Sequence, residues 1–378
     1  MSDDKHNIDG YVSLSQAIEF IAHNPEVRVH LEGNPGMGKS SATPLISKRA
    51  SEIHDVEYVD AYFDAATADT GDVVYPLVDR ENKTYEWIAN SLFRLREGKR
   101  VVINIDELTK AFASVVNAVH PLLEQNNPRL GIEKLPKGSI VFSTGNLTSD
   151  GVGDKMQGHT RNRLVKLRVR NHTNEEWLHN YAVPNELHPI LCAWVHRKPE
   201  LFEMHTQYKD SDRAENGGKL PNPYIFDPKM QGGQGCVTPR SLSFCSPILK
   251  SYERKVIDYH TCRQALVGTI GEVGGRDLIS FVDAHATLPH LEHIIAKPLE
   301  APMPTDLGAM CLLSWELQAK LDKDNAISLM QYVGRMTPEW QSVVRFALVK
   351  HPTKMNIVTR IKEFTHWFAE NHDLVASV

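Results

Sequence analysis

Short apolar runs alternate with amphipathic segments through the first 170 residues, a pattern typical of strands that alternate with helices. Residues 13–23 place apolar side chains at helical spacing, and Ser13 can cap that helix. Strands are expected at 27–32, 56–63, 101–108, 139–146 and 164–170. Such alternation predicts a parallel sheet covered by helices, so we expect an α/β core through about residue 171.

Two further segments of this region have patterns of their own. Residues 73–88 predict a hairpin that turns at Asp79–Asn82. Pro76 confines its strand to the edge of a sheet, because proline cannot donate a ladder hydrogen bond. Helices are expected at Glu86–Glu97 and at 112–124.

Beyond residue 171 strand patterns fade and helical patterns dominate. The segment 205–237 is rich in Gly, Pro, Asn and Asp. It is too long for a passive connection, so we expect it to be either functional or poorly ordered. Several helical patterns follow in residues 257–378, without a convincing repeat or a low-complexity tract.

Composition narrows the class of protein. The 378 residues, 41% of them hydrophobic and 24% charged, are typical of a globular protein of two or three domains. A net charge of −5 gives no overall attraction for nucleic acid or anionic membranes. The five cysteines form no C-x-x-C pair, the N-terminus is polar, and no apolar run reaches about 18 residues. We therefore expect a cytoplasmic protein without a disulfide framework or a membrane span.

The stretch GNPGMGKSSATPL, residues 33–45, matches the phosphate-binding pattern G-x-x-x-x-G-K-S/T. In such a loop, glycines let backbone N–H groups converge on phosphate oxygens, and the helix that follows adds its positive end. Lys39 would contact the β- and γ-phosphates, and the Ser40 hydroxyl would bind Mg²⁺. The residues expected to contact the nucleotide are Gly33, Asn34, Pro35, Gly36, Met37, Gly38, Lys39, Ser40 and Ser41.

Hydrolysis of the nucleotide needs acidic groups on a neighbouring strand, and VVINIDE supplies two. We expect Asp106 to hold magnesium through water, and Glu107 to orient and activate the attacking water. Asn104 interrupts the apolar run of this strand. Asn146 ends SIVFSTGN and could position the same water or the γ-phosphate, although polar residues at strand ends are common.

Three arginines are candidates to neutralise the charge that develops in phosphoryl transfer. Arg161 and Arg163 lie in HTRNRL, just before a strand, and the alternative is that they are solvated edge charges. Arg240 lies in VTPRSL, where Thr238 can cap a helix and Pro239 fits its first turn. A cation is unfavourable at this end of a helix, which favours recruitment of Arg240 by an anion, although an exposed arginine costs little there.

The motifs GNPGMGKS, INIDE, STGN, NRL and TPRSL occur in an order and spacing that resemble those of the AAA+ ATPases. The resemblance covers roughly residues 10–285 and is greatest to the MoxR-type group, which includes the CobS-like chelatase subunits. It implies an αβα P-loop core with a five-stranded parallel sheet, a helical lid, and a hexameric ring that uses ATP and Mg²⁺. We expect a nucleotide-binding core at 1–171 and a lid at 172–283, followed by a C-terminal helical extension at 284–378 that has no counterpart in the resemblance.

The same resemblance assigns roles to individual residues. Asn146 matches sensor 1, Arg163 the arginine finger with Arg161 as second candidate, and Arg240 sensor 2 on the lid. The hairpin at 73–88 falls where this group carries an insert that projects toward the pore of the ring.

The resulting hypothesis is a MoxR-like ATPase that works as an oligomeric ring to remodel or activate a client protein, in the manner of a chaperone. Members of this group often act with a partner that carries a von Willebrand A domain. Two alternatives stay open. One is a nucleic-acid motor or a subunit of a defence or restriction complex, which the acidic composition disfavours. The other is a nucleotide-gated scaffold that turns over slowly.

Overall fold

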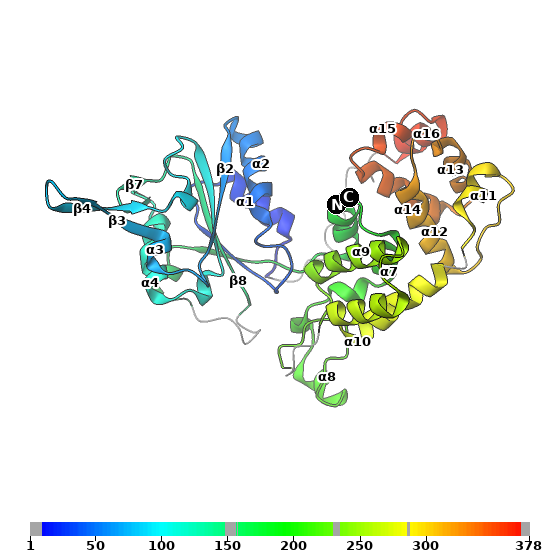
Figure 1. Cartoon of the computed structure of the whole chain (residues 1–378), viewed down its shortest axis with the longest axis horizontal. Coiled ribbons are helices and arrows are strands. Elements are labelled where there is room, and N and C mark those ends of the chain that lie inside the picture. Colours follow the sequence, from blue (N-terminus) through cyan, green and yellow to red (C-terminus); the bar gives the residue numbers. More distant parts are fainter. Residues whose placement is uncertain (1–9, 148–155, 157, 230–234, 286–287, 372–378) are drawn as a thin grey trace. The chain divides into compact units, whose positions relative to one another are not determined.

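The structure is a computed structural model that describes residues 10–147, 156, 158–229, 235–285 and 288–371. It divides between Asn171 and His172 into two compact units, each of which is described by itself. Figure 1 shows a first unit of strands and helices, coloured mainly blue to cyan, and a second unit of helices, coloured green to red.

The first unit is built on a five-stranded sheet with the strand order β2-β5-β8-β1-β9. All neighbouring strands in it are parallel. The strands are β1 (Val29–Glu32), β2 (Tyr58–Asp64), β5 (Arg100–Asp106), β8 (Ile140–Gly145) and β9 (Val165–Arg168). The expected strands and the parallel sheet are therefore confirmed.

Helices cover both faces of this sheet. α1 (Leu14–His23) and α2 (Ala42–His54) pack in one core with β1 and with one face of β8. α4 (Ala113–Val119) and the 3-10 helix η4 (His120–Leu123) pack in a second core on the opposite face. The helix expected at 112–124 is thus present, with a 3-10 end. The short remaining elements of this unit are α3 (Thr70–Val73), α5 (Gly158–Arg161), η2 (Ser91–Phe93), η3 (Leu108–Lys110), β6 (Arg129–Leu130) and β7 (Glu133–Lys134).

The two-stranded hairpin of β3 (Val74–Asp79) and β4 (Thr84–Ala89) projects from the rest of this unit (Figure 1). The strands are antiparallel, and Asp79 pairs with Thr84 at the last step before the turn. The predicted hairpin is confirmed.

The helix expected at Glu86–Glu97 is not formed. The first part of this segment belongs to β4, and the chain then makes only the 3-10 turn η2. This turn ends at Arg94, which adopts a left-handed conformation with φ 54°. The physical reason is nonlocal: Trp87 pairs with Pro76 across the hairpin, and cross-strand packing outweighs the helical spacing.

Each edge of the five-stranded sheet has backbone groups that are bonded by a segment outside the sheet. Beside β9, the Val12 N–H donates to the Arg168 carbonyl at 2.8 Å, and the Arg170 N–H donates to the Val12 carbonyl at 2.9 Å. Beside β2, the Arg94 guanidinium donates to the Asp60 carbonyl at 3.1 Å. β9 lies at the edge, as its alternating sequence predicts.

The second unit is helical over the residues that the structure describes. Its longer helices are α7 (Pro189–Arg197), α9 (Pro239–Glu253), α10 (Tyr259–His285), α12 (Leu307–Lys320), α13 (Ala326–Val333), α14 (Pro338–Lys350) and α16 (Lys362–Glu370). Its shorter elements are α6 (Asn174–Trp177), η6 (Leu178–Ala182), η7 (Pro199–Phe202), η8 (His205–Gln207), α8 (Asp210–Glu215), α11 (Leu291–Ala296) and α15 (Met355–Val358). α10 is kinked at Gly271, where φ is 81°. In the described ranges, no helix combines the length and apolar character needed to cross a membrane.

Side chains from both sides of the expected lid–extension boundary share one core. Trp194 of α7 and Leu266 of α10 are buried in the same cluster as Trp315 of α12. A second cluster, which includes Tyr332 and Phe364, belongs to the C-terminal helices. The division of this unit into a lid and an extension stays a prediction.

The segment 205–237 contains regular structure, although its residues 230–234 lie outside the described ranges. Arg213 on α8 forms a bidentate ion pair with Asp227, in which both nitrogen–oxygen distances are 2.8 Å. Burial alone raises the pKa of Asp227, but hydrogen bonds from Arg213 and from the Lys229 N–H lower it below the ordinary value. Residues 205–229 thus contain two short helical elements and a buried ion pair, and the role of the segment stays a prediction.

Candidate nucleotide-binding site

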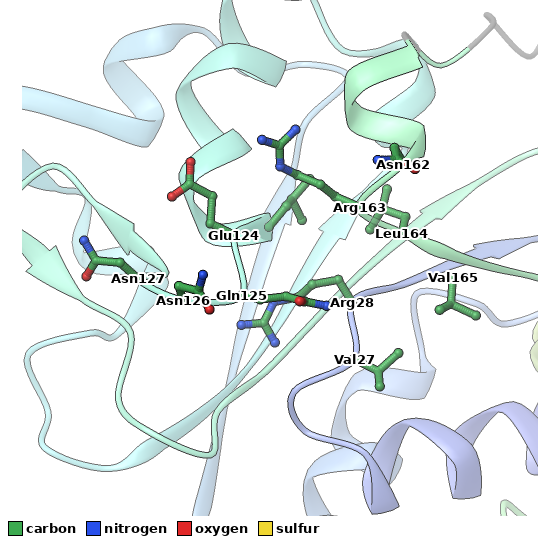
Figure 2. A pocket seen from close by; sticks show the side chains of 11 residues that line it. Val27, Arg28, Glu124, Gln125, Asn126, Asn127, Asn162, Arg163, Leu164 and Val165 are labelled. Carbon is green, nitrogen blue, oxygen red and sulfur yellow. The ribbon is translucent and has the colours of Figure 1, made fainter.

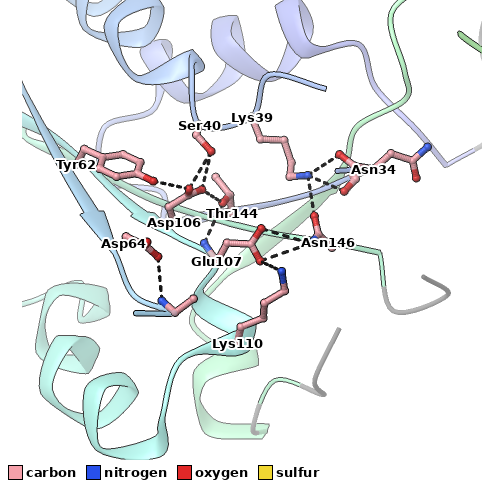
Figure 3. Close-up of polar contacts among 12 residues, drawn as sticks. Asn34, Lys39, Ser40, Tyr62, Asp64, Asp106, Glu107, Lys110, Thr144 and Asn146 are labelled. Carbon is pink, nitrogen blue, oxygen red and sulfur yellow. Dashed lines mark hydrogen bonds and ion pairs between the residues drawn. The ribbon is translucent and has the colours of Figure 1, made fainter. Parts of the chain in front are cut away.

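Parallel strands bring their carboxyl ends to one edge of a sheet, and the polar residues at the ends of β1, β5 and β8 meet there. The loop 33–41 follows β1, Asp106 and Glu107 stand at the end of β5, and Asn146 follows β8. Figure 3 shows their side chains turned toward one another. The structure thus brings together the phosphate loop, the acidic pair and the asparagine that the sequence singles out.

The loop has the backbone that phosphate binding requires. Gly38 has φ 97°, a left-handed conformation that other residues rarely adopt. An added Cβ at Gly33 would lie 2.5 Å from the Met37 sulfur and 3.0 Å from the Val169 carbonyl oxygen, so a side chain there would require its neighbours to shift. The Met37 side chain is buried in the core of this unit. The loop leads into α2, whose positive N-terminal end favours an anion.

Lys39 is 6% exposed and links this loop to the end of β8. Its ammonium group donates to the carbonyls of Gly33 at 2.6 Å and Asn34 at 2.8 Å, and to Asn146 Oδ1 at 3.3 Å. An ammonium group among converging backbone amides attracts phosphate oxygens. The other expected contacts lie in the same loop, and their contact with a nucleotide stays a prediction: Asn34, Pro35, Gly36 and Ser41.

The Asp106 carboxylate accepts hydrogen bonds from three hydroxyl groups (Figure 3). Ser40 Oγ lies 2.9 Å from both carboxylate oxygens, and the Tyr62 hydroxyl donates to Oδ2 at 2.7 Å. Thr144 Oγ1 donates to Oδ1. Burial and the hydrogen bond to Asp106 raise the pKa of Tyr62, so its phenol is the donor.

No sequence motif marks Tyr62 or Thr144 as a residue of the site. Both lie near the carboxyl ends of strands that flank β5 in the sheet. That strand order was the missing signal, because it places hydroxyl groups from β2 and β8 on either side of Asp106.

Glu107 has a left-handed backbone, with φ 54° and ψ 36°. Such a conformation costs a residue other than glycine about 1–3 kcal/mol. Its carboxylate pairs with Lys110 Nζ at 2.7 Å and accepts from Asn146 Nδ2 at 3.3 and 3.5 Å. Its N–H donates to Thr144 Oγ1 at 3.2 Å. Asn146 therefore touches both Lys39 and Glu107.

The donors at this edge fit a magnesium–triphosphate group by their chemistry. The hydroxyl of Ser40 and the carboxylate of Asp106 are the hard oxygen ligands that magnesium prefers. Lys39 and the loop amides supply the positive counterpart for phosphate oxygens.

Buried polar side chains connect the strands and the helix that carry this site. Asn104, the residue that interrupts the apolar run of β5, is fully buried and donates to Thr43 Oγ1 at 3.1 Å. Thr43 donates in turn to the Ser40 carbonyl at 3.2 Å, so β5 is tied to the start of α2. His30 on β1 lies 2.8 Å from Ser143 Oγ on β8, and burial lowers the pKa of His30 to about 3, so its ring is neutral.

Arg163 lies near the amino-terminal ends of the strands, whereas the phosphate loop lies at their carboxyl ends. It precedes β9, and the β9 residue Val165 donates its N–H to the Arg28 carbonyl before β1 begins, at 2.8 Å. Arg163 lines a pocket of about 470 Å³ together with Arg28, Glu124 and other polar residues (Figure 2). At 3.3 Å per residue, β1 is roughly 13 Å long, and it separates the amino-terminal ends of the strands from the phosphate loop of the same chain.

The other two arginines are exposed. Arg161 ends the short helix α5. Arg240 lies in the first turn of α9, where the predicted cap is present because Thr238 and Ser241 form reciprocal hydrogen bonds. Arg240 belongs to the second unit, so its role toward the nucleotide stays a prediction.

A glycine loop between a parallel strand and a helix, beside an acidic strand end, defines a P-loop nucleotide-binding domain. The family model described as "AAA domain (dynein-related subfamily)" matches residues 28–142. This part of the chain is therefore similar to an AAA domain, and the AAA+ P-loop fold expected from the sequence is confirmed.

Three solved structures show weaker similarity. A candidate ATPase from Cytophaga hutchinsonii is 13% identical over 69% of this chain and 82% of its own, with a TM-score of 0.31. NtrX from Brucella abortus, solved in complex with ADP, is 14% identical over 93% and 67%, with a TM-score of 0.32. A RuvB variant from Thermotoga maritima is 14% identical over 76% and 74%, with a TM-score of 0.34. These similarities say nothing about the function of this chain. The comparison with curated proteins found no significant match.

Proposed function

We propose that this chain is a MoxR-like AAA+ ATPase that binds ATP with Mg²⁺, hydrolyses it in a hexameric ring, and remodels or activates a partner protein. Besides the AAA match, one observation carries the proposal. Asn146 is hydrogen-bonded both to Lys39 of the phosphate loop and to Glu107 at the end of β5. A single side chain thereby connects the group that would sense the γ-phosphate with the group that would act on water.

The roles of the residues follow from their chemistry. The loop amides and Lys39 hold the triphosphate, and Ser40 with Asp106 holds magnesium, which supplies positive charge beside the phosphate oxygens. Glu107 orients a water molecule and accepts its proton as the water attacks. Asn146 fixes the position of Glu107 relative to Lys39.

Assembly into a ring is supported by the position of Arg163. It lies at the amino-terminal ends of the strands, remote from the phosphate loop of its own chain. It would therefore reach a nucleotide only if that nucleotide were bound to another subunit. An arginine supplied in this way contributes about 10³-fold or more to hydrolysis. Arg161 is the second candidate for this role, and Arg240 adds charge from the second unit.

Action on a partner protein is supported by the β3–β4 hairpin. Its exposed side chains include Tyr75, Leu77, Val78, Tyr85 and Trp87, which are 40–63% exposed. The rings of Tyr85 and Trp87 meet edge to face at 5.9 Å. Clustered exposed apolar groups of this kind mark interaction surfaces. We propose a client or an adaptor with a von Willebrand A domain as the partner, in the cytoplasm, where the five free thiols of the chain persist.

A subunit-mixing experiment tests the ring. Arg163→Ala and Lys39→Ala should each abolish most ATP hydrolysis, because one lacks the arginine and the other the phosphate contact. Mixed rings contain some interfaces that join an intact Lys39 site to an intact Arg163, and there partial activity should return. If both variants form rings and no mixture regains activity, Arg163 does not act between subunits. An ATPase rate per subunit that is independent of protein concentration in a monomer would overturn the proposal.

A further inference from the structure

We propose that Tyr62 is a positioning residue for magnesium, acting through the carboxylate of Asp106; this inference rests on the proposed function. The Tyr62 hydroxyl donates to Asp106 Oδ2 at 2.7 Å, which is shorter than the 2.9 Å between Ser40 Oγ and the same oxygen. Tyr62 comes from β2, the strand next to β5, and lies in register with Asn104, two residues before Asp106. It therefore reaches the carboxylate from the side opposite to β8.

The bond constrains how Asp106 presents its oxygens. A carboxylate has about four lone-pair sites. Thr144 and Ser40 donate to Oδ1, whereas Tyr62 and Ser40 donate to Oδ2. With both oxygens engaged by hydroxyl groups, the carboxylate is held against rotation and favours contact with magnesium through water over direct coordination. Ser40 is itself an expected magnesium ligand, so Tyr62 is the donor to Oδ2 whose bond does not depend on the metal.

The role is separable from support of the fold. The Tyr62 side chain is 48% exposed, and replacement by phenylalanine removes one hydroxyl while retaining the ring. Tyr58 provides a matched control on the same strand. Its hydroxyl donates to the Gly138 carbonyl at 2.8 Å, near the end of β2 that is remote from Asp106.

The test measures nucleotide binding rather than turnover. A fluorescent ATP analogue is titrated into the full chain and into the Tyr62→Phe and Tyr58→Phe variants, first with EDTA and then over a series of magnesium concentrations. We expect all three proteins to bind the analogue equally in EDTA. Tyr62→Phe should need about 3- to 10-fold more magnesium for the half-maximal effect on binding, the range of one net hydrogen bond. Tyr58→Phe should match the parent protein.

The outcomes separate this inference from the proposed function. If the parent binds the analogue and Tyr62→Phe has the same magnesium requirement, the inference is wrong and the proposed function stands. A loss of affinity in Tyr62→Phe that is equal in EDTA and in magnesium also overturns it, since the residue would then support the loop as a whole. A parent protein that binds no nucleotide under either condition overturns the proposed function and this inference together.

Discussion

Lys110 holds the carboxylate that we expect to activate water, so its replacement should raise the basal rate of ATP hydrolysis. Lys110 Nζ lies 2.7 Å from Glu107 Oε2, one turn further along the chain in η3. A carboxylate that is paired with an ammonium group has one oxygen engaged. Glu107 must leave this pair before it acts as a base, and Lys110→Met removes the partner.

The size of the effect follows from the exposure of the pair. The side chains of Lys110 and Glu107 are 31% and 26% exposed, so solvent screens their attraction. Ion pairs of this kind contribute about 0.2–1 kcal/mol. If that free energy is lost from the resting state alone, the rate rises by up to about fivefold.

The assay is steady-state hydrolysis at saturating ATP near neutral pH. Lys110→Arg keeps the charge and should stay close to the parent rate. Lys99→Met is a second control, since it breaks the exposed Lys99–Glu57 pair, 2.6 Å long, in the same unit. A rate in Lys110→Met that equals or falls below the parent rate would refute the reasoning, because it would mean that Lys110 supports Glu107 instead of restraining it.

Three further predictions concern the site, the hairpin and the second unit. Lys39→Ala should lose nucleotide affinity, whereas Glu107→Gln should retain ATP without turnover; a Glu107→Gln variant that hydrolyses at the parent rate would exclude Glu107 as the base. Replacing Asp79–Asn82 with a short neutral turn should leave basal ATPase within a few-fold while client action is lost; insoluble protein would instead make the hairpin part of the folding core. Arg213→Met leaves the buried Asp227 unpaired, which costs about 3 kcal/mol locally and should speed limited proteolysis of 205–229 roughly tenfold or more. Because the folded pKa of Asp227 is lowered, the pair stabilises fully above its unfolded pKa of about 3.9 and loses its contribution as pH falls below it. Arg213→Met should therefore differ from the parent at neutral pH and converge with it in acid; equal proteolysis at neutral pH would contradict the assignment.

The central site could be predicted from the sequence because its parts sit at strand ends. Strand–loop–helix order fixes the position of Lys39, and parallel pairing brings Asp106 and Asn146 to the same edge. Local signals were also sufficient for α1, where Ser13 and Gln16 form the reciprocal cap.

What could not be predicted depends on contacts between distant segments. The hairpin over 73–88 was predicted from its turn, but the helical spacing that begins at Glu86 was misleading, because Trp87 still pairs with Pro76 in the hairpin. Tyr62 has the sequence of an ordinary strand aromatic, and only the order of the strands gives its hydroxyl a partner. Asn104 stood out in the sequence as a polar interruption of an apolar strand. Its role is the hydrogen bond to Thr43, which exists only because α2 packs on β5.

The bonded edges of the sheet have a consequence for how copies of this chain can come together. A parallel sheet with open edges is a template for strand addition, and proteins held at high local concentration are exposed to that misassembly. Val12 takes up backbone groups beside β9, and Arg94 takes up a carbonyl of β2. β9 also carries Lys166 and Arg168, both paired to the buried Glu32. If two such edges met, Lys166 and Arg168 of one copy would repel the same residues of the other copy. Fibre growth through the sheet is thereby disfavoured, so in the proposed ring the helices, loops and hairpin would make the contacts between subunits.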